Sequence, residues 1–270
     1  MNYQEIFPSF HLQKYIKCFW QLEQNIRTFE NTPQPVLPDG CFELIFNLSD
    51  KFHRYHLDGT VETQPNTIIV GQMRRAVSIK PTGKILLFGI RFHSNGAFPL
   101  FKFPLNQLQD KIENLQAIWG GFGVEFEEKI NEASSFYERI HIAEKIIREK
   151  IDSDVDKVIL NAQKIISANR GQISIEYLAN HLGISWKKLE RNFQQQVGLS
   201  PKVFCRIIRL QNVLQILKNH PKAKLIDVAL TFGYYDQAHL IHEFKDFSGQ
   251  TPLAFIETEK RLTEVFIGTN

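Results

Sequence analysis

Cationic side chains crowd one stretch of this 270-residue chain. Nine lysines and arginines lie between Lys187 and Lys224, and the same stretch holds a single acid, Glu190. Ammonium and guanidinium groups at this density are suited to bind phosphate oxygens, although a solvated basic face on an ordinary helical domain is the alternative. The cations are Lys187, Lys188, Arg191, Lys202, Arg206, Arg209, Lys218, Lys222 and Lys224.

A pattern that occurs twice indicates how these cations are positioned. The two copies are offset by 50 residues up to a glycine and by 51 residues after it, a register that chance rarely preserves. The first copy contains Leu178, Ala179, Leu182, Gly183, Ser185, Leu189, Phe193, Gly198, Pro201 and Phe204. The second contains Val228, Ala229, Phe232, Gly233, Asp236, Leu240, Phe244, Gly249, Pro252 and Phe255.

Each copy predicts a helix, a tight turn and a second helix. The glycine supplies the left-handed turn, and Ser185 or Asp236 is a suitable N-cap for the second helix. A further helix from Pro201 to near Asn219 would span about 28 Å and would hold the two units close to one turn of B-DNA apart, about 34 Å. The exposed positions expected to contact DNA are Trp186, Lys187, Lys188, Glu190 and Arg191 in the first unit and Gln237, Ala238, His239, Ile241, His242 and Lys245 in the second.

The segment from Val155 to Phe255 resembles the DNA-binding domain of the AraC/XylS family of bacterial transcriptional regulators. The matching stretches are LANHLGISWKKLERNF, GLSP, RIIRL and VALTFGYYDQAHLIHEFKDFSGQTP. His242 stands where the family usually has an arginine, so the second unit should contribute more shape fit than base discrimination. The resemblance implies sequence-specific binding to double-stranded DNA, contact with RNA polymerase if the protein is an activator, and a possible homodimer.

The amino-terminal half has the period of β-strands. Cys41 to Leu48 alternates, with Phe42, Leu44 and Phe46 on one face, and Thr67–Gly71, Ala76–Ile79 and Lys84–His93 are further strands. Pro38-Asp39-Gly40 is a turn signal before the first of these strands, and short strands joined by turns predict an antiparallel barrel or sandwich. The fold class is therefore α+β, with the β domain followed by an all-α double helix-turn-helix domain.

The segments LPDGCFELIFNL and LLFGIRFHSNGAFPLF resemble the β-rich, loosely cupin-like sensory domain that often precedes such a DNA-binding unit. We expect Glu43 and Asn47 to meet Arg91 around the pocket of a small-molecule effector. The alternative is that Glu43 and Arg91 form an exposed cross-strand pair of the ordinary kind.

The connecting segment reads as helical, over Leu105–Trp119 and again over Phe126–Ile151. The second helix could form a dimer seam or pack on its own barrel. We expect four parts: residues 1–120 for sensing or dimerisation, 121–152 as a helical connector, 153–257 as the DNA-binding domain, and 258–270 as a tail.

Other features favour a non-enzymatic, cytoplasmic protein without cofactor, catalytic residue or metal ligand. Cys18, Cys41 and Cys205 are widely spaced, and the chain has no basic and apolar leader and no membrane-length apolar run. His53, His56 and His93 are weak candidates for a metal site, and His53 and His56 are expected in a polar loop. Two enzyme alternatives are a cupin-like metalloenzyme and an alkylation-repair protein with a reactive cysteine. A third alternative is an architectural DNA binder without an effector.

Overall fold

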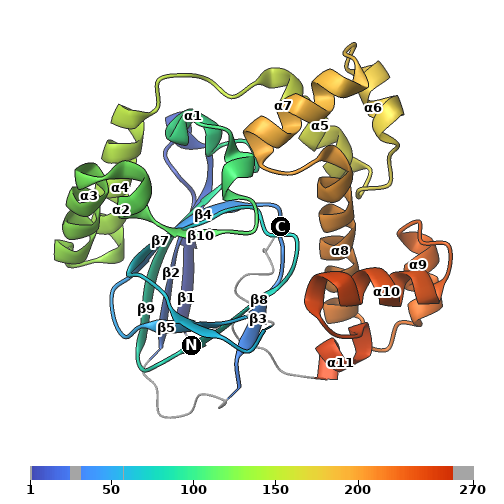
Figure 1. Ribbon diagram of the computed structural model, residues 1–270, viewed down its shortest axis with the longest axis horizontal. Helices are drawn as coiled ribbons and strands as arrows, with labels where there is room; N and C mark the ends of the chain where they lie inside the picture. The colour runs from blue at the N-terminus through green and yellow to red at the C-terminus, as the bar shows by residue number, and fades with distance from the viewer. Residues whose placement is uncertain (1, 25–31, 57, 258–270) are drawn as a thin grey trace.

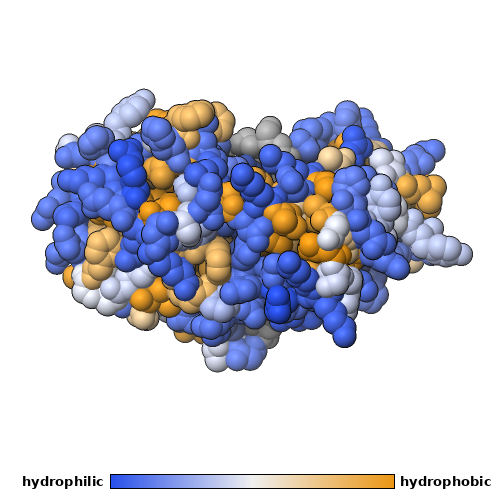
Figure 2. Space-filling model, turned by 90° about the horizontal axis from the view of Figure 1, so that it is seen from above, coloured by the Kyte–Doolittle hydropathy of each residue, from blue (hydrophilic) through white to orange (hydrophobic). Residues whose placement is uncertain are grey.

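Strands occupy the amino-terminal half of the molecule and long helices the carboxy-terminal half, in a computed structural model that describes residues 2–24, 32–56 and 58–257 (Figure 1). This order confirms the predicted α+β class. Hydrophilic side chains cover most of the face seen in Figure 2, with smaller hydrophobic groups among them. None of the described helices is both long and apolar enough to cross a membrane.

The β domain consists of two antiparallel sheets. The six-stranded sheet has the order β1 (Asn2–Ile6), β2 (Ile16–Gln24), β9 (Ile85–Phe92), β4 (Phe42–Asn47), β7 (Thr67–Val70) and β10 (Ile112–Asn114). The four-stranded sheet has the order β3 (Gln34–Val36), β8 (Val77–Pro81), β5 (Phe52–Tyr55) and β6 (Val61–Thr63).

Alternation along β4 separates two cores, as the sequence predicts. Phe42, Leu44 and Phe46 belong to a core that extends to the connecting helices, whereas Ile45 belongs to the core between the two sheets. The ring centroids of Phe46 and Phe126 are 5.0 Å apart, so the outer face of the sheet is closed by aromatic packing against helices.

The connecting segment differs from the prediction at two places. Leu105–Trp119 is not one helix: it forms the 3₁₀ turn η2 (Leu105–Leu108), strand β10 and helix α2 (Leu115–Trp119). Phe126–Ile151 is two helices, α3 (Gly121–Glu132) and α4 (Phe136–Lys150), because the chain turns before Ser135, which caps α4. The even spacing of apolar residues continues across that turn, so the sequence pattern does not indicate where the first helix ends.

Helices α3 and α4 pack on their own β domain. Ile130, Ala143 and Ile147 are fully buried in the same core as β4. Of the two alternatives for this segment, the structure therefore shows packing on the barrel. Helices α2, α3 and α4 lie together beside the sheet in Figure 1.

Two shorter predictions also need correction. His53 lies within β5, not in a loop, because its strand pairs with β6 and β8. Leu12, Tyr15, Ile16 and Phe19 predict a short helix or turn that leads into Trp20–Glu23. A 3₁₀ turn over Phe10–Leu12 and the turn after it do precede the strand, but β2 already begins at Ile16 and is buried on both faces. Only the turn η1 (Phe10–Leu12) and a short helix α1 (Phe98–Phe101) interrupt the strands before η2 in the described part of the chain.

The carboxy-terminal half is a set of helices around one core. Pro201 is at the amino-terminal end of the long helix α8, which is 19 residues long as predicted. The helices are α5 (Lys157–Ala168), α6 (Ile175–His181), α7 (Trp186–Val197), α8 (Pro201–Asn219), α9 (Leu225–Thr231), α10 (Gln237–Ser248) and α11 (Pro252–Glu257). The predicted tail at 258–270 lies outside the described residues.

Candidate nucleic-acid interface and effector cavity

The first helix-turn-helix unit consists of α6 and α7. Gly183 takes the left-handed conformation in the turn, and the Ser185 hydroxyl accepts a hydrogen bond from the Lys188 N–H at the start of α7. Leu189 and Phe193 are completely buried and hold α7 in place, whereas Trp186 is 53% exposed. Lys187, Lys188 and Arg191 are exposed on the same helix, and Glu190 is half-buried, with Gln194 Nε2 donating to it.

The second unit consists of α9 and α10 and has the same local construction. Asp236 accepts a hydrogen bond from the His239 N–H, which confirms the predicted N-cap. Gln237, Ala238, His239 and Lys245 are exposed, but Ile241 is half-buried and packs on the helical core. The His242 side chain is 79% exposed, and its Nδ1 lies 3.6 Å from Asp246 Oδ2.

A buried network under α10 changes the interpretation of the basic stretch. Glu243 accepts hydrogen bonds from Arg206 Nε at 2.7 Å and from the Tyr234 hydroxyl at 3.0 Å, and Arg209 Nε lies 3.9 Å from the same carboxylate. Two of the nine cations therefore hold α8 to the second unit instead of lying free for phosphate. Spacing along the sequence gave no signal for Glu243, because its two arginine partners lie on α8, more than thirty residues away.

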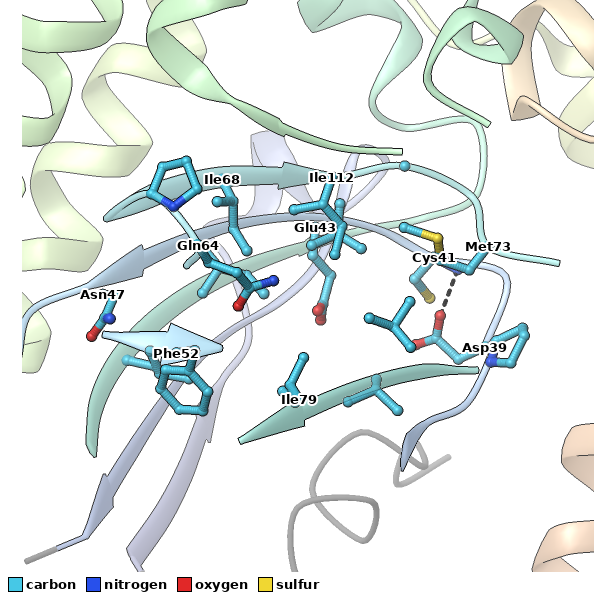
Figure 3. Close-up of a pocket in the computed structure, with 18 of the residues that line it drawn as sticks. Asp39, Cys41, Glu43, Asn47, Phe52, Gln64, Ile68, Met73, Ile79 and Ile112 are labelled. Atoms are coloured by element: carbon cyan, nitrogen blue, oxygen red, sulfur yellow. Dashed lines mark hydrogen bonds between the residues drawn. The ribbon is translucent and has the colours of Figure 1, made fainter. Parts of the chain in front are cut away.

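A cavity of about 90 Å³ lies between the two sheets of the β domain (Figure 3). Its walls are mostly aliphatic and aromatic, with Glu43, Asn47, Gln64, Asn66, Asp39 and Cys41 as polar members. A buried water needs only about 10–15 Å³ in the same measure, so the space exceeds that of a single solvent molecule several times. The cavity is therefore a candidate ligand site.

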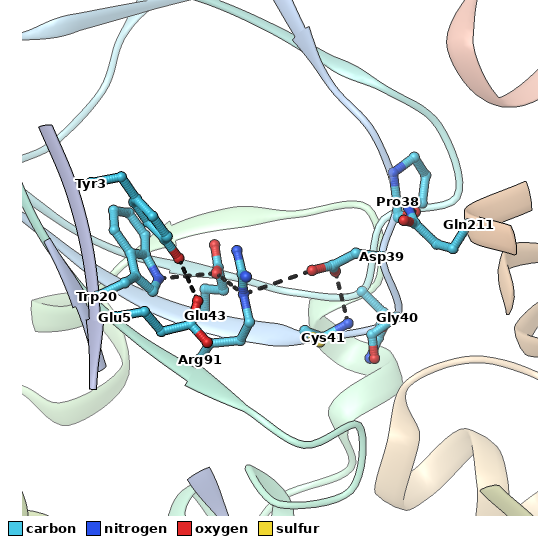
Figure 4. A network of polar contacts seen from close by, with 11 residues as sticks. Tyr3, Glu5, Trp20, Pro38, Asp39, Gly40, Cys41, Glu43, Arg91 and Gln211 are labelled. Atoms are coloured by element: carbon cyan, nitrogen blue, oxygen red, sulfur yellow. Dashed lines mark hydrogen bonds and ion pairs between the residues drawn. The ribbon is translucent and has the colours of Figure 1, made fainter. Parts of the chain in front are cut away.

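Glu43 of this wall and Arg91 behind it, predicted to meet, form a buried ion pair (Figure 4). Arg91 Nε lies 2.6 Å from Glu43 Oε1, and Trp20 Nε1 donates to the same oxygen at 3.2 Å. The pair is not an exposed one, since Glu43 is 8% and Arg91 1% exposed. Burial raises the pKa of the Glu43 carboxyl, and the Glu43 and Asp39 carboxylates hold the pKa of Arg91 well above its ordinary value despite burial.

The third predicted pocket residue, Asn47, lines the cavity but does not contact Arg91. Its side-chain amide donates to the Asp50 carbonyl oxygen at 2.8 Å and shapes the turn after β4. Asp39, which the sequence marks only as part of a turn, instead lies near the pair, with Oδ2 3.8 Å from Arg91 Nε. A turn signal identifies the loop but not what its side chain meets.

The loop that carries Asp39 also contacts helix α8. Gln211 Nε2 of α8 donates to the Pro38 carbonyl oxygen at 2.5 Å. Gly40 has a φ of +78°, and a β-carbon there would lie 3.0 Å from the Phe204 ring, so the backbone approaches α8 closely. One side of this loop thus faces the cavity. The other side faces helix α8, which joins the two helix-turn-helix units.

Two further contacts join the halves of the molecule. The Ala76 N–H donates to the Phe247 carbonyl oxygen near the end of α10 at 2.7 Å. The segment before it is also cavity wall, through Gly71 and Met73. Helix α7 contacts the turn η2. Both second helices of the two units therefore contact the β domain.

The histidines and cysteines weighed for chemistry have ordinary partners. His53 Nδ1 lies 3.1 Å from Thr63 Oγ1, and His93 Nε2 lies 3.1 Å from the Gln13 carbonyl oxygen. Among the described residues there is no group of three His, Cys, Asp or Glu side chains placed to hold a metal ion. Burial raises the pKa of Cys18 to about 12 and that of Cys205 to about 11, which keeps both thiols protonated.

Two family models match the chain. Residues 4–114 match a domain of unknown function (DUF6597), and residues 178–258 match a helix-turn-helix domain. The HTH-type transcriptional regulator MtrA of Neisseria gonorrhoeae is 35% identical over 83 residues, which are 31% of this chain and 27% of MtrA. An uncharacterized HTH-type transcriptional regulator of Haemophilus influenzae is 36% identical over 78 residues, or 29% of this chain and 26% of the relative. Each match spans about a quarter of the curated relative.

Solved structures also align with this chain. ToxT from Vibrio cholerae aligns over 88% of this chain and 98% of its own, with 12% identity and a TM-score of 0.49. A probable AraC family transcriptional regulator from Rhodopseudomonas palustris aligns over 38% of this chain and 96% of its own, with 26% identity and a TM-score of 0.34.

The paired units on α8, together with the match over residues 178–258, identify the carboxy-terminal half as a helix-turn-helix domain. The amino-terminal β-rich domain contains the other match, to the domain of unknown function over residues 4–114.

Proposed function

We propose that this protein is a sequence-specific DNA-binding transcriptional regulator of the AraC type, controlled by a small effector bound in the β domain. The observation that carries the proposal is the pair of helix-turn-helix units joined by α8. A helix of 19 residues spans about 28 Å, close to the 34 Å or so between successive major grooves on one side of B-DNA. Both second helices can then enter the duplex together.

Base recognition is assigned to the amino-terminal part of α7. Recognition helices of this motif contact base edges through their first turns, and Trp186, Lys187 and Arg191 are exposed there. Arg191 can form a bidentate contact with guanine, whereas Lys187 and Lys188 suit phosphate. The half-buried Glu190 can accept from cytosine if its contact with Gln194 opens.

The second unit contributes mainly shape complementarity. Its first exposed positions, Gln237, Ala238 and His239, include only one side chain of the amide type that reads adenine well. The partly exposed side of Ile241 can contact a thymine methyl group. Lys245 lies two turns along α10, where it can bind a phosphate. His242 stands where the family usually has an arginine, which is permanently charged. Its imidazole lies beside the Asp246 carboxylate, and this acid reduces the attraction of the position to phosphate.

Effector control is supported by the position of the cavity. Two of its wall segments, Pro38–Cys41 and Gly71–Met73, continue into the contacts with α8 and α10. A ligand that moves either segment would change how the DNA-binding units are held. Such a ligand binds the two arrangements of the protein with different affinities, which is what regulation requires. The proposed parts are a β domain with its packed helices, and a DNA-binding domain beginning near α5.

We assign no enzymatic activity to the chain. The alkylation-repair alternative needs a reactive thiolate, but burial raises the pKa values of Cys18 and Cys205, and the metalloenzyme alternative lacks a ligand group among the described residues. A homodimer, and contact with RNA polymerase in the case of an activator, belong to the proposal as partners to be tested.

The test is footprinting of the full-length protein on the DNA upstream of its own gene. We expect two protected major-groove segments about one helical turn apart on one face of the duplex. Protection that is uniform along the DNA and unaffected by Arg191→Ala would contradict sequence-specific reading and would leave an architectural DNA binder.

A further inference from the structure

Glu43 presents to the cavity one carboxylate oxygen to which no described residue donates a hydrogen bond. Both hydrogen bonds that the side chain accepts, from Trp20 and Arg91, go to Oε1. No described residue donates to Oε2, and Figure 3 shows the carboxylate pointing into the middle of the space. Because Glu43 lines the cavity and this oxygen keeps its capacity to accept a hydrogen bond, the site favours a ligand that donates to it.

The charged side chains around this oxygen carry a net negative charge. The charged side chains in the described cavity wall are Asp39 and Glu43, both acids. The guanidinium of Arg91 pairs with both carboxylates, and two anions against one cation leave one negative charge uncompensated. A cation brought into the cavity would complete this balance, which in a low-dielectric site is worth more than in water.

An anionic ligand is a poorer match for the same geometry. Arg91 lies behind Glu43 and is not part of the cavity wall. Its Nη2 is unpaired among the described residues, but that atom is buried, so a ligand carboxylate could reach it only by displacing Glu43. Displacement would leave the Glu43 carboxylate buried without its cation, which is strongly unfavourable.

The remainder of the wall selects an apolar body. Phe52, Ile68 and Ile79 face the cavity in Figure 3 from three different strands. Ile45 and Leu87 close it from β4 and β9. Such a surface stabilises a ligand by removing its apolar area from water.

We propose that the cavity binds a small primary or secondary ammonium compound with an apolar body, whose N–H groups donate to Glu43 Oε2 and whose charge is shared with Asp39. This assignment rests on the proposed regulatory function, since it names the chemical class of the effector. It also gives the effector a route to α8. An ammonium group that attracts Asp39 acts on the loop whose Pro38 carbonyl oxygen accepts from Gln211.

Calorimetric titration of the full-length protein with benzylamine, benzyl alcohol and benzoate at pH 7.5 tests the proposal. The three probes share one ring and differ in head group and charge. We expect benzylamine to bind at least about tenfold more tightly than either other probe, because only its ammonium group donates a charge-assisted hydrogen bond to the carboxylate. Equal affinities, or a preference for benzoate, would overturn the assignment.

Variants then locate the site. Glu43→Gln should weaken benzylamine binding at least about tenfold, and Asp39→Asn should weaken it less. Glu113→Gln is the matched control, because Glu113 follows the wall residue Ile112 on β10 and its side chain points to the other face. If Glu43→Gln does not fold, the benzylamine affinity of Asp39→Asn still tests the proposal. Unchanged benzylamine affinity in folded Glu43→Gln would show that the amine binds elsewhere.

Operator binding, measured in parallel by fluorescence anisotropy, separates this inference from the function on which it rests. Specific DNA binding together with failure of the amine preference refutes the ligand class and leaves the regulator intact. A benzylamine preference that depends on Glu43, in a protein without specific DNA binding, supports the ligand class and refutes the regulatory function.

Discussion

Gln211 and Pro38 join the rod of the DNA-binding domain to the wall of the cavity. The Gln211 side chain donates from α8 to the Pro38 carbonyl oxygen at 2.5 Å, across 173 residues of sequence. The next residue of that loop, Asp39, lies 3.8 Å from the Arg91 guanidinium inside the β domain. One loop therefore connects a buried ion pair with the helix that sets the spacing of the two DNA-binding units.

Gln211→Ala should uncouple the two halves without abolishing either activity. The lost hydrogen bond contributes about 0.5–1.5 kcal/mol, enough to reduce the change in operator affinity that an amine produces. The measurement is operator affinity with and without benzylamine. Gln215→Ala, one turn further along α8 at an exposed position, is the control and should respond as the wild type does. An identical response in Gln211→Ala would show that the loop does not transmit binding.

Arg191→Ala should relax the choice of base at one position of the operator. A bidentate contact with guanine contributes about 1–3 kcal/mol of discrimination. Selection from a randomised site should reveal one flattened position, whereas Gln195→Ala, exposed one turn later on α7, should leave the profile unchanged. An unaltered preference in Arg191→Ala would mean that α7 is not the reading helix.

Glu243→Gln should destabilise the second unit. The buried carboxylate accepts from Arg206 and Tyr234, and replacing it with an amide weakens these charge-assisted bonds by about 1–3 kcal/mol. Urea unfolding followed by circular dichroism measures the loss. Asp246→Asn, on the exposed side of α10 and 3.7 Å from Arg206, should change stability by less than about 0.5 kcal/mol. Equal effects of the two substitutions would contradict a structural role for the buried network.

Benzylamine affinity should fall as the pH is lowered from 8 to 5. Burial raises the pKa of Glu43, so its carboxylate takes up a proton at a higher pH than an exposed glutamate does, and the protonated form no longer attracts an ammonium group. Arg91, Asp39 and Cys41 face the same carboxyl and shift this titration. Titration calorimetry at several pH values measures the effect, and Glu43→Gln should show a nearly flat profile. A wild-type affinity that is constant over this range would exclude Glu43 as the partner.

The helical half was predictable because its signals are local. Ser185 and Asp236 cap their own helices, and Gly183 makes its own turn, so each element can be recognised from a few adjacent residues. Pro201 likewise marks the start of α8. These local signals do not identify Glu243 as the partner of Arg206, because Glu243 lies on another helix.

The β domain was less predictable because its strands are defined by distant partners. Phe52–Tyr55 has one buried residue, and only pairing with β6 and β8 makes it a strand. The alternation of Cys41–Leu48 did predict which face carries Glu43, and strand pairing then places it opposite Arg91. The role of Asp39 depends on two domains at once, and no short stretch of sequence contains that information.

The fixed length of α8 limits the DNA that the protein can recognise. A continuous helix of 19 residues cannot stretch or swivel as a flexible linker does, and Arg206 and Gln211 fasten it on two sides. The two contacted segments of the duplex must therefore keep one rotational phase. Inserting about five base pairs, half a turn, would place the second groove on the far side of the DNA, and adding about ten would restore the face but exceed the reach of the rod.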